Sequence, residues 1–157
     1  MEKFISRKLN SGYSSCFRQW RATDTHCSFL HGYAVSFEVS FIGEIDHRNW
    51  VYDFGGFKRS SYQIQGQSLK EYFDWLFDHT VIVAQDDPFL DVFMELHDAE
   101  IIQLRVLPDV GCEMFAKHVH EVVSGLLDYE TMGRVKVEYV KFIENEKNSA
   151  IYRNTNV

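Results

Sequence analysis

Residues 33–41, YAVSFEVSF, alternate between apolar and polar side chains. Every second residue from Val35 to Phe41 is large and apolar, and the residues between them are serine or glutamate. Because successive side chains of a β-strand point to opposite faces of the sheet, this pattern predicts a strand that buries only one face. Helices elsewhere in the chain must then cover that face.

Two later segments change to the 3.6-residue period of a helix. In residues 68–79 the apolar side chains recur at i, i+3, i+4, i+7 and i+8, and Ser68 stands where an N-cap is expected. Residues 112–127, CEMFAKHVHEVVSGLL, carry a second apolar stripe, so both segments predict amphipathic helices. The stripes comprise Leu69, Tyr72, Phe73, Leu76 and Phe77 in the first helix and Phe115, Val119, Val122, Val123 and Leu126 in the second.

Shorter segments complete the predicted order of elements. Residues 50–54 predict a strand that forms a hairpin with residues 33–41, across the turn-rich sequence GEIDHRN. Residues 86–99 predict a short helix after an Asp-Asp-Pro start. We therefore expect one α+β domain over residues 1–157, with an antiparallel four-stranded sheet and two main helices on one face. Further strands are expected at residues 101–107, 134–142 and 151–152.

The composition argues against several classes of protein. The chain of 157 residues carries a net charge of -7, which disfavours non-specific binding to nucleic acid. No apolar run approaches the roughly 20 residues needed to span a bilayer, and the N-terminal MEKFISRKLN lacks the apolar centre of a signal peptide. The three cysteines are an odd number, which argues against a disulfide framework. We therefore expect a cytoplasmic protein with free thiols and with neither a membrane nor a nucleic-acid partner.

Cys27 and His31 stand four residues apart in THCSFLHGY, just before the alternating strand. A thiolate is a nucleophile, and a nearby cation, base or metal would lower the pKa of the thiol. A buried cysteine that packs as a small apolar side chain has the same sequence signature. His31 and Tyr33 should share a face of the strand, but a tyrosine favours a metal site less than a second histidine would. The residues alone leave these interpretations open.

Asp78 and His79 end the first long helix. A carboxylate beside an imidazole suits proton transfer, whereas a histidine at a helix C-terminus is also favoured by the helix dipole alone. Glu113 begins the second helix, where an acid is expected for the same dipole reason. Glu144 ends a strand, where it could accept two N–H groups of a heterocycle or could simply be solvated. These alternatives also stay open.

Five motifs follow one another along the chain: CSFLHGY, GEIDHRNWVYDFGGFK, FDHT, GCEMFAKHVHE and IENEKNSAIY. In this order and at this spacing they resemble the 6-pyruvoyltetrahydropterin synthase / 6-carboxytetrahydropterin synthase family. That family has a cysteine before an HGH, a G-E-[IV]-D turn, an LDH, a P-T-S-E helix start, and a glutamate eight residues before a tyrosine. The resemblance covers nearly the whole chain and implies the tunnelling fold.

The resemblance also implies a role for each matching residue. Cys27 takes the place of the catalytic cysteine, and Asp78 and His79 take the places of the catalytic proton-relay pair. Glu144 takes the place of the glutamate that holds the N–H groups of the pterin ring. Glu113 takes the place of the glutamate that opens the second helix and belongs to the substrate site.

The zinc site of the family is matched only in part. His31 takes the place of one zinc ligand, whereas the other two histidine positions hold Cys16 and Tyr33. Thiolate, imidazole and phenolate can all bind a metal, but a tyrosine must first lose a proton with a pKa of about 10. The resemblance thus implies either a Zn²⁺ ion held by Cys16, His31 and Tyr33, or a metal lost together with the histidines.

In function, the resemblance implies a zinc-dependent lyase that acts on 7,8-dihydroneopterin triphosphate. The product would be 6-carboxy-5,6,7,8-tetrahydropterin of the queuosine pathway, or that of a close variant. The alternative is a non-catalytic or repurposed pterin- or purine-binding homologue. The family further implies a homohexamer, a dimer of trimers with sites at subunit interfaces. Arg18, Arg21 and Lys58 are candidates for contacts to the triphosphate.

Overall fold

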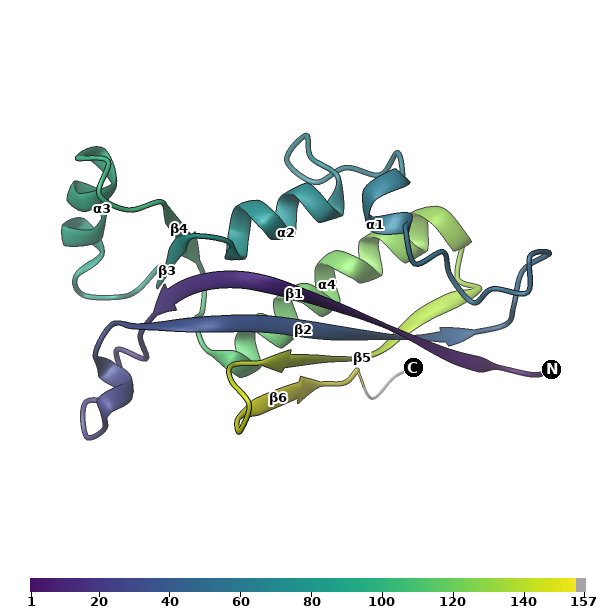
Figure 1. Ribbon diagram of the computed structural model, residues 1–157, viewed down its shortest axis with the longest axis horizontal. Helices are drawn as coiled ribbons and strands as arrows, with labels where there is room; N and C mark the ends of the chain where they lie inside the picture. The colour runs from purple at the N-terminus through teal and green to yellow at the C-terminus, as the bar shows by residue number, and fades with distance from the viewer. Residues whose placement is uncertain (155–157) are drawn as a thin grey trace.

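The computed structural model describes residues 1–154 (Figure 1). The strands form one sheet in the order β4-β3-β1-β2-β5-β6. Among the described residues, no helix combines the length and the apolar content needed to cross a membrane. The elements in chain order are β1 (Phe4–Phe17), η1 (His26–Ser28), β2 (His31–Gly43), α1 (Gly56–Arg59), α2 (Leu69–Phe77), β3 (Thr80–Ala84), α3 (Leu90–Asp98), β4 (Leu104–Leu107), α4 (Cys112–Thr131), β5 (Val135–Ile143) and β6 (Ser149–Tyr152).

The sheet is built on a long hairpin of β1 and β2, whose antiparallel register runs from Phe4 opposite Gly43 to Phe17 opposite His31. On the β2 side, β5 and β6 extend the sheet as further antiparallel strands. On the other side, β3 runs parallel to the end of β1, and β4 runs parallel to β3. The α+β class is confirmed, but over residues 1–154 the sheet is mixed and has six strands instead of four antiparallel ones.

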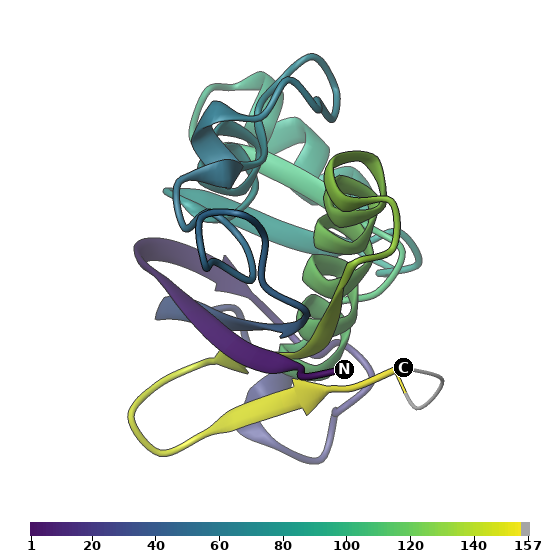
Figure 2. The ribbon, with the colours of Figure 1, turned by 90° about the vertical axis from the view of Figure 1, so that its right-hand side faces the viewer.

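Helices α2 and α4 lie on one face of the sheet, as the sequence predicts (Figure 2). The predicted N-cap of α2 is confirmed as part of a capping box. In this box the Ser68 hydroxyl accepts the Glu71 N–H, and the Glu71 carboxylate accepts the Ser68 N–H. The predicted helix within residues 86–99 is confirmed as α3, and the strands predicted near the C-terminal half of the chain are confirmed as β4, β5 and β6.

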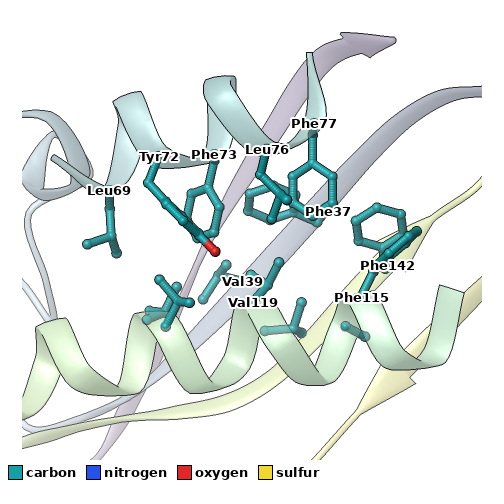
Figure 3. Packing of buried hydrophobic residues seen from close by; sticks show 14 of the residues in the cluster. Phe37, Val39, Leu69, Tyr72, Phe73, Leu76, Phe77, Phe115, Val119 and Phe142 are labelled. Atoms are coloured by element: carbon teal, nitrogen blue, oxygen red, sulfur yellow. The ribbon is translucent and has the colours of Figure 1, made fainter. Parts of the chain in front are cut away.

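The apolar stripes of α2 and α4 meet the inner face of β2 and β5 in a core rich in phenylalanine (Figure 3). Phe37 of β2 is completely buried in this core. Its ring centroid lies 4.9 Å from that of Phe73, 5.9 Å from that of Phe77 and 6.3 Å from that of Phe142. Aromatic pairs at such distances add to the free energy gained from burying their area. Phe37 therefore joins both layers of the fold.

Replacing Phe37 with alanine should lower the free energy of unfolding by about 3–5 kcal/mol, because it removes buried area and leaves a cavity among rings that cannot close over it. Urea denaturation of both proteins measures the difference. Phe29→Ala is the matched control, since that ring is 69% exposed and its loss should change stability by less than about 0.5 kcal/mol. Equal losses in the two variants would contradict this description of the core.

A second, smaller cluster of apolar residues lies on the opposite face of the sheet. Val81 and Val83 of β3 pack there against Phe93 of α3, and Cys16 contacts the same cluster. The residues of β3 that alternate with the two valines belong to the main core. Because neighbours along a strand point to opposite faces, α3 covers the face that α2 and α4 leave free at this edge. The Cys16 side chain therefore belongs to the α3 side of the sheet.

Residues 50–54 do not form a strand, so this prediction was wrong. The side chain of Asp46 accepts hydrogen bonds from the backbone N–H groups of Arg48 and Trp50, at 2.8 and 3.2 Å. Such bonds between a side chain and nearby backbone compete with pairing in a sheet. The hairpin partner of β2 is instead β1, which precedes it in the sequence.

Candidate functional site

Three segments that carry predicted site residues lie toward the same end of the molecule (Figure 1). They are the β1–β2 loop with Cys27, the beginning of α4 with Glu113, and the β5–β6 turn with Glu144. The strand β2 also begins at this end, with His31 and Tyr33. The sheet therefore gathers groups from the two halves of the sequence.

Cys27 is a free and exposed thiol in the short helix η1. The hydroxyl of Thr25 caps this turn by accepting the Cys27 N–H at 3.1 Å. The carbonyl of Cys27 accepts the Gln19 N–H at 2.7 Å, which ties the turn to the start of the loop. In this chain Cys27 does not pack as a small apolar side chain, which was the alternative to a reactive thiol.

The ring of Tyr33 lies close to those of Phe17 and His31, with centroid separations of 4.4 and 4.8 Å. Burial, followed by the charge of Glu144 and a hydrogen bond to it, raises the pKa of Tyr33 to about 12, and Cys27 makes a smaller contribution. Tyr33 is therefore a neutral phenol at physiological pH, and the Glu144 carboxylate lies near enough to influence its pKa. The structure brings Tyr33, Glu144 and Cys27 near one another.

Glu144 is half-buried at the end of β5, where its N–H donates to the carbonyl of Asn148 at 3.0 Å. Cys112, the first residue of α4, is buried and donates its thiol to the carbonyl of Phe142 at 3.1 Å. Burial, followed by the charges of Glu144 and Glu113, raises the pKa of the Cys112 thiol to about 11. Both predicted substrate-site glutamates therefore lie near the start of α4.

A pocket of about 430 Å³ opens between the beginning of β2 and the β5–β6 turn. Its lining includes His31, Tyr33 and Glu144. This volume is in the range of about 300–1,000 Å³ that is typical of small-molecule sites. With a carboxylate and an aromatic ring on its walls, the pocket can hold a flat heterocycle through paired N–H groups.

The side chains of Asp78 and His79 are in contact, with Nδ1 of His79 3.1 Å from Oδ1 of Asp78. The pair is fixed to β1, because the Ser14 N–H donates to Asp78 at 3.3 Å and the His79 N–H donates to the Ser14 carbonyl at 2.6 Å. His79 has a φ of 58°, a left-handed conformation that costs about 1–3 kcal/mol. Its side chain is 75% exposed, so the imidazole is available to a ligand or to another chain.

The Asp78–His79 pair does not meet the Glu144 pocket within one chain. His79 lines a separate open groove of about 710 Å³, together with Cys16 and the loop that follows α3. This groove and the pocket have no lining residue in common. A site that includes both the pair and Glu144 therefore needs a second chain.

The proposed metal ligands do not converge on one point. In the register of β1 and β2, Cys16 lies opposite Gly32, whereas Phe17 lies opposite His31. The β1 residue that packs against Tyr33 is accordingly Phe17, and its phenyl ring offers no donor. Tyr33 itself keeps its proton, since its pKa is about 12. These residues do not fit a three-ligand metal ion. The described residues also contain no group of three or more His, Cys, Asp or Glu side chains that could hold one.

None of the three candidate cations for a triphosphate lines the pocket. Arg18 forms a two-pronged ion pair with Asp87, and Arg21 is paired with Asp86. Lys58 lies in α1, which is far from the β1–β2 loop (Figure 1). A triphosphate contact in this region would therefore need cations other than these in the single chain.

Sequence reasoning missed three residues that shape this end of the molecule: Phe17, Cys112 and Asp87. Alternation in the segment SSCF places Cys16 and Phe17 on opposite faces of the strand. Only the register of the hairpin shows which of the two shares a face with Tyr33. Cys112 carried no signal beyond its place at a helix start. Asp87 was interpreted as part of a helix start signal and is instead a buried partner of Arg18.

Comparison with known proteins identifies what the whole chain resembles. The sequence profile of the family described as 6-pyruvoyl tetrahydropterin synthase matches residues 6–155. No curated protein matches the chain.

Solved structures agree with the family match. An uncharacterized protein from Wolinella succinogenes has a TM-score of 0.77 at 20% identity, covering 98% of this chain and 99% of that one. The 6-pyruvoyl tetrahydropterin synthase of Caenorhabditis elegans has a TM-score of 0.61 at 18% identity, covering 99% and 98%. The enzyme of the same name from Plasmodium vivax has a TM-score of 0.62 at 15% identity, covering 96% and 98%. Identities this low show a shared fold, and the predicted tunnelling fold is confirmed.

Proposed function

Because the chain belongs to the 6-pyruvoyl tetrahydropterin synthase family, we propose that it is a lyase that binds a pterin in the pocket of Glu144. One observation supports this function best. The half-buried Glu144 carboxylate lines a pocket of suitable size together with Tyr33, which is a neutral phenol.

The chemistry of a pterin matches that carboxylate. A pterin presents its amino group and the neighbouring ring N–H on one edge, and a carboxylate presents two acceptor oxygens in one plane. Two parallel hydrogen bonds to a charged acceptor fix both the affinity and the orientation of the ring. Tyr33 lines the same pocket beside Glu144, whereas Glu113 is exposed at the start of α4 and does not line it.

The proposed substrate is 7,8-dihydroneopterin triphosphate, and the proposed product is 6-carboxy-5,6,7,8-tetrahydropterin or that of a close variant. For the 6-carboxy product, water is consumed, triphosphate leaves, and cleavage of the bond between the first two side-chain carbons releases the other two carbons as acetaldehyde. Elimination of triphosphate requires a base that removes a proton from the carbon next to the one that carries the leaving group. Cys27 and the Asp78–His79 pair are the groups proposed to move these protons. An imidazole oriented by a carboxylate suits such transfers near neutral pH.

A second copy of the chain is proposed to complete the site. Within one chain His79 lines a different groove from the pocket of Glu144. β1 pairs with β3 only over its last residues, Ser15 to Phe17, so most of that edge is open to another strand. A homohexamer formed as a dimer of trimers would pair these edges and bring His79 of one chain toward Cys27 of another.

Zinc at Cys16, His31 and Tyr33 is not part of this proposal, because these groups face different sides of the sheet. Metal analysis of the purified protein should find far less than one zinc per chain, and a chelator should change neither the melting temperature nor the affinity for a pterin. One zinc per chain that disappears in a His31→Ala variant would contradict this reading of the site.

The aromatic residues beside the pocket favour a second candidate function. Tyr33 lines the pocket, and the buried Phe17 stacks behind it, so one wall presents a supported aromatic ring. Such a wall suits binding of a ring more than activation of its side chain. In that case the protein would be a repurposed pterin- or purine-binding homologue without turnover.

The two candidates are separated by incubating the purified protein with 7,8-dihydroneopterin triphosphate and following triphosphate and pterin products by mass spectrometry. Catalytic release of triphosphate with a 6-substituted tetrahydropterin supports the lyase. Tight binding without turnover supports the repurposed homologue. Neither binding nor turnover, in a correctly folded and assembled protein, overturns both.

A further inference from the structure

The β1–β2 loop that carries Cys27 is held by hydrogen bonds within itself and, at its beginning, by exposed contacts of Trp20 and Arg21 with Asp86. The Thr25 N–H donates to the Ala22 carbonyl at 3.1 Å, and the Gln19 N–H donates to the Cys27 carbonyl at 2.7 Å. Most side chains of the loop are exposed. Segments with few buried contacts open at low free energy, so these internal bonds alone would not fix the thiol relative to the sheet.

Arg18 connects this loop to the rest of the molecule. Its Nη1 donates to the carbonyl of Ser28, the residue after Cys27, at 3.1 Å. Its Nε and Nη2 donate to the two carboxylate oxygens of Asp87, at 2.9 and 2.7 Å. Asp87 is fixed in turn, because it accepts the Phe89 N–H at 2.9 Å in the loop between β3 and α3. One guanidinium thus spans the thiol-bearing turn and a second, well-packed part of the chain.

This ion pair is buried, unlike the one beside it. The side chain of Asp87 is 1% exposed and that of Arg18 is 19% exposed. Burial by itself would raise the pKa of Asp87, but the hydrogen bonds from Arg18 and Phe89 hold that pKa below its ordinary value. The neighbouring pair of Arg21 and Asp86 is 64% and 47% exposed, and exposed pairs of this kind contribute little.

We propose that Arg18 and Asp87 are positioning residues that fix the Cys27 turn against the β3–α3 loop. Asp87 orients the guanidinium in one plane, and the guanidinium then holds the Ser28 carbonyl. Arg18 is accordingly engaged in holding the loop and is not a contact for the substrate triphosphate. The hydrogen bonds of Arg18 place the Cys27 turn directly. The effect of this placement on turnover rests on the proposed function.

The test compares Asp87→Asn with Asp86→Asn, which makes the same chemical change in the adjacent, exposed pair. In Asp87→Asn the backbone amides of residues 19–29 should exchange with deuterium about ten-fold faster than in the wild type. The value of kcat should fall about ten- to 100-fold with KM within about two-fold, because the thiol is displaced while the ring pocket is intact. Asp86→Asn should match the wild type in all three measurements.

Arg18→Lys is a milder second variant, which keeps a positive charge beside Asp87 but loses the planar fork. It should also speed exchange in the loop, while amides of α4 keep their protection. If folded Asp87→Asn and Arg18→Lys both exchange the amides of residues 19–29 at the wild-type rate, the positioning role is overturned. If the wild-type protein shows no turnover, only the proposed function is overturned. The deuterium exchange of residues 19–29 still decides whether Arg18 and Asp87 hold the Cys27 turn.

Discussion

Replacing Glu144 with glutamine should weaken pterin binding by about 100-fold, which corresponds to about 3 kcal/mol. The carboxylate can accept both N–H groups on one edge of the ring, whereas the amide offers one acceptor and turns an NH₂ group toward the second donor. One charge-assisted hydrogen bond is lost and an unfavourable donor–donor contact replaces it. Isothermal titration of the two proteins with 7,8-dihydroneopterin measures the difference.

Glu146→Gln is the matched control for this prediction. Glu146 lines the same pocket but is exposed in the β5–β6 turn, so its loss changes the net charge equally without removing the anchor. Its affinity should stay within about two-fold of the wild type. Equal weakening in both variants would mean that charge alone, and not a specific contact to Glu144, governs binding.

Replacing Cys27 with alanine should lower turnover by about 10²- to 10⁴-fold while pterin affinity stays close to that of the wild type. The thiol is exposed at the end of the molecule where the pocket opens, but it does not line the pocket wall. The loss should therefore appear in kcat. Steady-state kinetics combined with the same titration separates the two effects.

Cys16→Ala provides the control for the thiol. Cys16 contacts Val81, Val83 and Phe93 on the α3 side of the sheet, so its sulfur does not face the Glu144 pocket. Its removal should reduce stability slightly and leave kcat within about three-fold of the wild type. Loss of turnover in Cys16→Ala together with an active Cys27→Ala would reverse the assignment of the two cysteines.

The elements that the sequence predicted well are those whose periodicity reflects a single buried face. β2, α2 and α4 each bury one side against the main core, and each shows an unbroken pattern. β3 was not predicted, because all five residues of TVIVA are buried and a strand covered on both faces does not alternate. β1 was not predicted, because its register shifts between Asn10 and Tyr13 and its first half exposes its apolar residues.

The positions of the candidate site residues could also be predicted only in part. The resemblance placed Cys27, Glu113 and Glu144 at positions that the fold brings toward one end of the molecule. It also grouped Cys16 with His31 and Tyr33, yet the hairpin register points Cys16 to the other face and puts Phe17 beside Tyr33. A shift of one residue exchanges the two faces of a strand, so a ligand position that is wrong by one residue falls on the opposite face of the sheet.

The Asp78–His79 pair shows a different limit. The sequence left open whether the two side chains interact, and the structure places them 3.1 Å apart. Their position relative to Cys27 could not follow from the sequence, because His79 lines a separate groove and any shared site depends on how chains assemble. Light scattering should give the mass of a hexamer, and a stable monomer would leave the two halves of the site apart.

A crystal structure of the protein with bound 7,8-dihydroneopterin would show whether Glu144 anchors a pterin in the pocket beside Tyr33. We expect the amino group and the adjacent ring N–H within about 3 Å of the two carboxylate oxygens of Glu144. A ring bound in the groove of His79, or elsewhere without contact to Glu144, would contradict this expectation.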